Sequence, residues 1–170
     1  ALHALLAGLT LMILLPATSW RPLSPDEFYP AKAVAILRQS GLTGNLAVTF
    51  RWGSYTAWNL HPRIKISMDG RYEETYPEST LHMNEGFFNE QGDDWKKLVR
   101  DFKVDFIIVE AARTRLTDED LATLGYQSIH RAKNYALWSL AEHAPQLLKT
   151  REKLPAALPD PLDARIPAAW

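Results

Sequence analysis

Three groups of residues that could bind or react with a ligand follow three apolar runs of the sequence, each where a predicted strand ends. Residues 51–55 read Arg-Trp-Gly-Ser-Tyr, residues 69–72 read Asp-Gly-Arg-Tyr, and residues 110–115 contain one glutamate and two arginines. Ligands of open α/β sheets bind beyond the carboxyl ends of the strands, so parallel neighbouring strands would bring these groups to one edge. The candidate ligand-binding residues are Trp52, Gly53, Ser54, Tyr55, Asp69, Gly70, Arg71 and Glu110.

These residue types suit a polar ligand that carries a sugar ring or an anionic group. Trp52 and Tyr55 offer flat faces on which a ring can rest. Gly53 lets the backbone turn tightly into a helix whose first N–H groups attract an anion. The guanidinium group of Arg71 can hold a phosphate or a carboxylate through two parallel hydrogen bonds.

A structural role for the same residues is the alternative. In that case Gly53 only ends a strand, and Asp69 accepts N–H groups within its own turn. Arg71 then pairs with Asp69 or with Glu110 and holds two loops together.

The sequence contains no motif that indicates catalysis or metal binding. It has no cysteine, which excludes thiol nucleophiles and thiolate metal sites, and it lacks the usual nucleotide-binding and serine-hydrolase signatures. A small hydrolase or transferase that uses Asp69 or Glu110 is the least favoured interpretation, because no nucleophile is paired with a base. We therefore expect no catalytic residue, no cofactor and no metal site. The histidines are scattered without an i, i+4 pair: His3, His61, His82, His130 and His143.

The elements that position these residues alternate between helix and strand. Helices are predicted over 31–39, 54–60, 95–102 and 117–124, and strands over 45–50, 64–68, 104–109, 126–130 and 135–140. The run Phe106-Ile107-Ile108-Val109 is apolar throughout, as in a strand covered on both faces. The pattern predicts an α/β fold: a small, three-layer, Rossmann-like domain with a mostly parallel sheet and a C-terminal antiparallel hairpin.

The first twenty residues contain no Lys, Arg, Asp or Glu and are long enough to cross a bilayer core as a helix. Trp20 and Arg21 suit the headgroup boundary. We interpret 1–20 as the end of a transmembrane helix that precedes the domain. A cleaved signal peptide, with the small residues 17–19 near its cleavage point, and a buried core helix are the alternatives.

The rest of the chain divides into a linker, one domain and a tail. Residues 21–30 form a proline-rich linker, 31–142 an extracytoplasmic α/β domain, and 143–170 an extended or disordered tail with five prolines. The composition, 46% apolar and 23% charged, is that of a globular protein. The net charge of -1 gives no basic face for nucleic acid, which is excluded as a partner.

The order of these segments resembles the C-terminal region of bacterial multi-spanning membrane proteins of the GT-C glycosyltransferase superfamily, which includes dolichyl-phosphate-mannose and arabinose-type transferases. In such proteins an aromatic-Gly-Gly-Tyr segment and an Asp-Gly-Arg segment precede an apolar strand. Ser54 replaces the second glycine here, and Arg51 stands where the family has an acidic residue. The matching residues are Trp52, Gly53, Tyr55, Asp69, Gly70 and Arg71.

The resemblance implies a role as an accessory domain. In GT-C enzymes the catalytic acid lies between early membrane helices and the donor is a polyprenyl-phosphate sugar. The chain is then a non-catalytic part of a glycosyltransferase on the extracytoplasmic side of the bacterial inner membrane. It helps bind the polyprenyl-phosphate sugar or a glycan acceptor, or braces the transmembrane bundle of the same chain. The alternative is a membrane-anchored periplasmic module that binds a carbohydrate or another small polar ligand.

Overall fold

A computed structural model describes residues 28–90, 92 and 94–155. None of the helices in these ranges is long and apolar enough to span a bilayer. The predicted membrane helix over 1–20 and most of the predicted linker lie outside the described residues. The elements are, in chain order, α3 (Ala31–Ser40), β1 (Gly44–Val48), α4 (Phe50–Leu60), β2 (Ile64–Ile66), α5 (Tyr72–Thr75), α6 (Glu78–Asn89), α7 (Lys97–Phe102), β3 (Phe106–Glu110), α8 (Asp118–Thr123), β4 (Tyr126–Arg131), β5 (Tyr135–Leu140) and α9 (Ala144–Lys153).

The strands form one mixed five-stranded sheet in the order β2-β1-β3-β5-β4. β1 pairs in parallel with β2 on one side and with β3 on the other, with Leu46 opposite both Ile66 and Phe106. β5 runs antiparallel to β3 and to β4. The predicted α/β class, the parallel centre and the C-terminal hairpin are confirmed.

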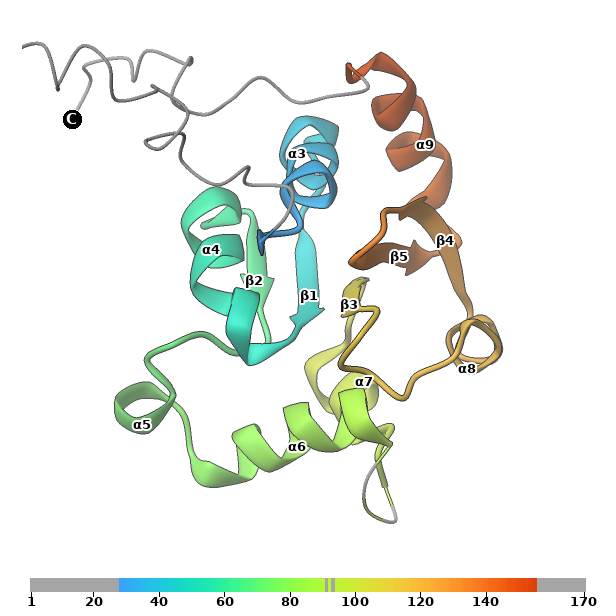
Figure 1. The fold of residues 1–170 in the computed structure, drawn as a ribbon. Helices are drawn as coiled ribbons and strands as arrows, with labels where there is room; N and C mark the ends of the chain where they lie inside the picture. Colours follow the sequence, from blue (N-terminus) through green and yellow to red (C-terminus); the bar gives the residue numbers. More distant parts are fainter. Residues whose placement is uncertain (1–27, 91, 93, 156–170) are drawn as a thin grey trace, which may run out of the picture.

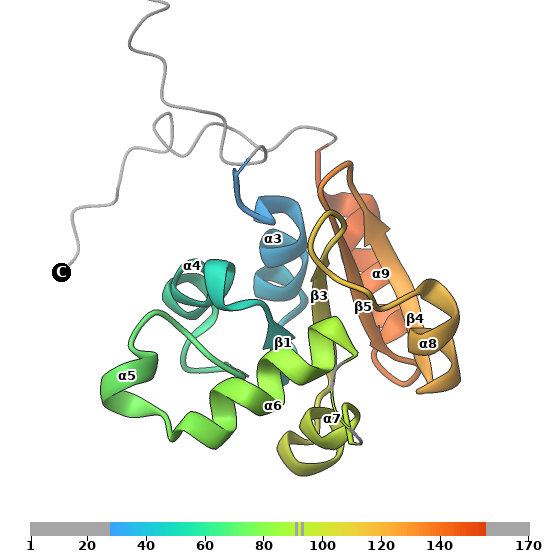
Figure 2. The same cartoon turned by 60° about the horizontal axis from the view of Figure 1, so that its bottom comes forward.

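Helices cover both faces of the sheet, which gives three layers (Figure 1, Figure 2). Alternate residues of β3 point to opposite faces, so Phe106 and Ile108 pack with α3, α4 and α9, whereas Ile107 and Val109 pack with α6, α7 and α8. The first connection, through α4, leads from β1 to β2. The second, through α5, α6 and α7, returns across the other face to β3 on the far side of β1.

Local signals set several element ends as expected. Gly41 follows α3 in the left-handed conformation, with φ of 74°, which ends a helix without the strain a side chain would add. Thr117 caps α8 through a capping box, in which its side chain accepts from the Asp120 N–H while the Asp120 carboxylate accepts in return.

The first strand is shorter and the following helix longer than predicted. Thr49 takes an extended conformation and α4 begins at Phe50, so residues 51–55 lie in the first two turns of a helix and not in a loop. The predicted strand over 45–50 therefore ends at Val48. The prediction erred because Gly53 disfavours a helix interior, and tertiary packing overrides that preference.

Three helices were not predicted: α5, α6 and α9. Residues 143–170 were expected to be extended, but Ala144–Lys153 form α9 and bury Ala144 and Leu147 against the sheet. Pro145 is compatible with this helix because it occupies the first turn, where its missing N–H has no partner to lose. Helix α6 lacks a regular apolar stripe, although it buries Phe87 and Phe88.

Candidate functional site

The three predicted groups share one edge of the sheet, as expected, because β2, β1 and β3 are parallel neighbours. They do not form one site. The group after β1 contacts the group after β2 on one side and the group after β3 on the other. The two contacts differ. Backbone packing closes the contact between the groups after β1 and β2, whereas the groups after β1 and β3 line a pocket.

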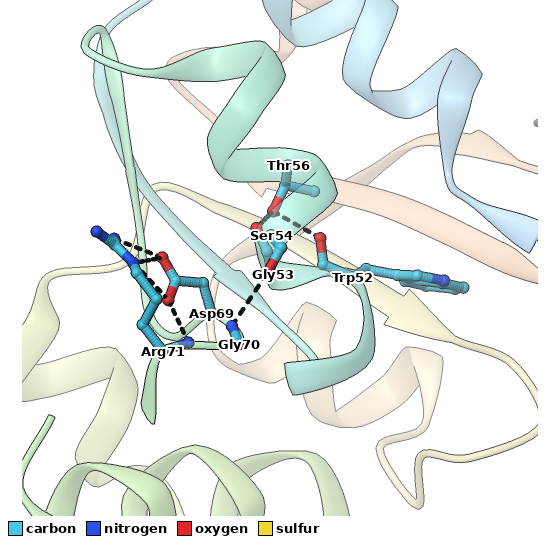
Figure 3. A network of polar contacts seen from close by, with 7 residues as sticks. All are labelled: Trp52, Gly53, Ser54, Thr56, Asp69, Gly70 and Arg71. Carbon is cyan, nitrogen blue, oxygen red and sulfur yellow. Dashed lines mark hydrogen bonds and ion pairs between the residues drawn. The ribbon is translucent and has the colours of Figure 1, made fainter. Parts of the chain in front are cut away.

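Helix α4 lies against the segment after β2 (Figure 3), and their backbones are too close at Gly53 for a ligand to lie between them. A Cβ placed on Gly53 would lie 2.1 Å from the Met68 carbonyl oxygen and 2.6 Å from the Asp69 Cα. Glycine is therefore required here for the close approach of two backbones. The Ser54 hydroxyl accepts a hydrogen bond from the Gly70 N–H at 3.1 Å and joins the same two segments.

Asp69 and Arg71 satisfy each other within their turn (Figure 3). The buried Asp69 carboxylate accepts from the Arg71 backbone N–H at 2.9 Å and from its Nη2 at 2.7 Å. The hydrogen bond from the Arg71 side chain holds the pKa of Asp69 below its usual value, although burial opposes the shift. This arrangement matches the structural alternative in which Asp69 and Arg71 pair, and their bonds hold the turn after β2 together.

The two aromatic residues of the first group pack within the domain. Trp52 is 2% exposed, and its indole N–H donates to the Phe28 carbonyl at 2.9 Å. Tyr55 stacks on Tyr29 with ring centroids 4.5 Å apart. Trp58, six residues after Trp52 and on a different face of α4, is 77% exposed. Neither Trp52 nor Tyr55 presents an open ring face of the kind expected for a sugar platform.

A pocket of about 420 Å³ lies between the segments that follow β1 and β3. Helix α4 contributes Arg51 and Trp52, the end of β3 contributes Glu110, and the turn after β3 contributes Arg113. The turn between β4 and β5 closes one side. The full lining consists of Phe28, Arg51, Trp52, Glu110, Ala111, Ala112, Arg113, Lys133 and Asn134.

Glu110 is the central charged group of this pocket. It is 5% exposed, and its Oε1 lies 2.8 Å from Arg51 Nη1 and 3.5 Å from Arg113 Nε. No hydrogen-bond donor among the described residues reaches its buried Oε2. A buried polar atom without a partner costs about 1–3 kcal/mol, more when charged. Because Oε2 is closed off from solvent, a bound molecule can supply the missing donor only if the carboxylate rotates toward the pocket.

The pocket also has a surplus of positive charge. Of the described residues that line it, three carry a cationic side chain and one a carboxylate. Arg51 and Arg113 are 45% and 65% exposed, so both can reach a ligand at the pocket mouth. The first turn of α4 forms part of the wall, and backbone N–H groups at a helix start favour an anion.

Part of this pocket was predicted from the sequence. Trp52 and Glu110 were predicted site residues and lie in it, whereas Gly53, Ser54, Asp69, Gly70 and Arg71 form the closed contact beside it. The sequence also indicated Arg51 and Arg113, because both belong to the groups of residues that follow predicted strands. Lys133 and Asn134 were predicted to form the hairpin turn, but the sequence gives no sign that this turn reaches the carboxyl end of β3.

Comparison with known proteins identifies no relative: the chain matches no family model, no curated protein and no solved structure. The resemblance to GT-C membrane proteins therefore rests on its sequence motifs. Function has to be inferred from the pocket.

Proposed function

We propose that this domain binds a phosphorylated sugar in the Glu110 pocket, as the accessory extracytoplasmic domain of a GT-C-like membrane glycosyltransferase. The observation that carries the proposal is the Glu110 carboxylate, which lines a pocket with excess positive charge and has one oxygen without a hydrogen-bond donor among the described residues. A sugar hydroxyl supplies the missing donor. A phosphate group is attracted by Arg51, Arg113 and Lys133.

The pocket volume is consistent with this ligand. Small-molecule pockets have volumes of roughly 300–1,000 Å³, and this one, at about 420 Å³, lies at the small end. That size fits one sugar with one phosphate and leaves a lipid tail outside. The headgroup of a polyprenyl-phosphate sugar has this chemistry, and the apolar, uncharged residues 1–20 would place the domain beside the membrane that holds such lipids.

The chemistry of the pocket argues for binding rather than turnover. Glu110 is paired with two arginines, and no serine, threonine or histidine is among the described residues that line the pocket. No hydroxyl or imidazole on this wall can therefore act as a nucleophile or as its base, and Glu110 is already paired with arginines. We place the transfer reaction in another part of the transferase.

Calorimetric titration with mannose 1-phosphate, mannose and inorganic phosphate tests the proposal. We expect mannose 1-phosphate to bind more tightly than either of the others. Glu110→Gln should weaken mannose 1-phosphate roughly tenfold or more, since it weakens a hydrogen bond to a charged group, yet leave phosphate unchanged or bound more tightly. Arg113→Ala should weaken both anions and leave mannose unchanged.

Arg71→Ala is the matched control, because Arg71 is an exposed arginine at the same edge that pairs with Asp69 and does not line the pocket. Equal binding of mannose 1-phosphate to wild type, Glu110→Gln and Arg113→Ala would reject the pocket as the site. A loss confined to Arg71→Ala would move the site to the β2 side. Reading the coding sequence upstream then separates a transferase domain, preceded by several membrane-length segments, from a singly anchored binding module.

A further inference from the structure

We propose a second, independent site: a divalent transition-metal site formed by Asp105, Glu142 and His143 at the opposite edge of the sheet. Asp105 directly precedes β3, and the other two residues follow β5 at the start of α9. Each side chain offers one ligand atom, and these three atoms lie within 4.8 Å of one another. The sequence did not indicate this cluster, because it contains one histidine with two carboxylates and no pair of histidines at i, i+4. Asp105 is also distant from the other two residues in sequence.

Two of the three distances in the cluster are close to those between ligands of a metal centre. His143 Nε2 lies 3.4 Å from Glu142 Oε1 and 3.5 Å from Asp105 Oδ1. Zinc bonds to His nitrogen and carboxylate oxygen of about 2.1 Å, set at the tetrahedral angle, put neighbouring donor atoms about 3.4 Å apart. The spacing is longer than a hydrogen bond to nitrogen, about 2.7–3.2 Å. The ordinary pair of His82 with Glu78 has the same spacing, so it is the convergence of two carboxylates on His143 that points to an ion.

Two of the three side chains are held in place by contacts on their far sides. The other carboxylate oxygen of Asp105 accepts the Asn45 backbone N–H at 2.7 Å, which leaves Oδ1 directed to His143. The His143 ring lies 5.2 Å from the Phe106 ring, and its backbone N–H donates to Leu140. Such outer contacts orient metal ligands and raise affinity.

Glu142 supplies the adjustable third ligand. Its side chain is 71% exposed, whereas those of Asp105 and His143 are 23% and 21% exposed. A small rotation of this side chain can complete the site at little cost in packing. One His nitrogen and two carboxylate oxygens suit Zn²⁺, and three protein ligands leave a fourth position for water. The bound ion would connect the start of β3 to the start of α9.

Titration of zinc chloride into the metal-free 170-residue chain tests the site. We expect one zinc ion whose binding depends on these three residues, and a melting temperature that rises with zinc concentration. His143→Ala and Glu142→Gln should each lower that affinity at least as much as the about 10–100-fold typical of outer-shell substitutions. Glu142→Gln is exposed and should fold normally, so it remains informative if His143→Ala is unstable.

His82→Ala is the matched control. His82 Nε2 lies 3.4 Å from Glu78 Oε1, the same spacing as in the proposed site, but among the described residues a single carboxylate is paired with it. Zinc binding should survive this change. If wild type takes up no stoichiometric zinc, or if His143→Ala and Glu142→Gln bind it as wild type does, the cluster is an ordinary set of ion pairs and the metal site is wrong. Neither result bears on the Glu110 pocket.

Discussion

Replacing Gly53 by alanine should destabilise the domain strongly, although the same change usually stabilises a helix. In an exposed helix interior, Gly→Ala gains about 1 kcal/mol. Here the new Cβ would lie 2.1 Å from a carbonyl oxygen of the neighbouring segment, whereas ordinary contact begins near 3.4 Å. The helix and the turn after β2 would have to separate by about 1 Å. Both obstacles are backbone atoms, which cannot rotate away.

We expect a net loss of about 3 kcal/mol in the free energy of unfolding, near the upper end of the usual cost of overpacking. Urea unfolding followed by tryptophan fluorescence measures it as a lower midpoint at an unchanged slope. Gly70→Ala is the control. A Cβ there meets only the Ser54 hydroxyl, at 2.9 Å, and that side chain can rotate, so we expect a loss of about 1 kcal/mol or less.

The result also separates the two interpretations of the Trp-Gly-Ser-Tyr segment. If Gly53 served a ligand, its alanine variant would fold normally and lose only binding. Stability equal to or above wild type, or equal to that of Gly70→Ala, would refute the close-packing argument. It would also reopen the β1–β2 side of the edge as a place for a ligand.

Three further predictions concern elements around the site. Leu147→Ala in α9 should cost about 3 kcal/mol in urea unfolding, since Leu147 is fully buried, whereas Lys149→Ala on the exposed face should cost almost nothing. Thr117→Ala removes the α8 cap and should cost about 1 kcal/mol by the same assay; no loss would reject the cap. Because hydrogen bonds from Arg71 lower the folded-state pKa of Asp69, its contribution is complete above the unfolded value near 3.8 and disappears as pH falls through the lower folded value. Thermal melts should therefore show Asp69→Asn less stable than wild type by about 1 kcal/mol at pH 6, with the gap narrowing below pH about 4; a gap independent of pH would contradict this.

The sequence predicted the sheet better than it predicted the helices. The run from Phe106 to Val109 marks a strand buried on both faces, and the glycines after α3 and α8 mark helix ends, because these signals are local. Helix α9 was not predicted, because its charged exposed residues and the nearby prolines are typical of an extended tail. Only its tertiary contacts show that Leu147 faces the sheet. The beginning of α4 was predicted four residues too late, because Gly53 disfavours a helix interior.

The candidate site was predicted at the correct edge but on both sides of β1, and the topology explains why only one side is open. The chain leaves β1 through α4 toward β2, and Gly53 lets this helix press onto the segment after β2. After β3 the chain turns the other way, toward α8 and the hairpin, so the connections diverge between β1 and β3. Ligands of doubly wound sheets bind where connections diverge in this way. Choosing between the two sides requires the strand order. Gly53 and Ser54 of the Trp-Gly-Ser-Tyr motif and the Asp-Gly-Arg motif therefore close the crevice between β1 and β2, whereas Arg51, Trp52 and Glu110 line the one between β1 and β3.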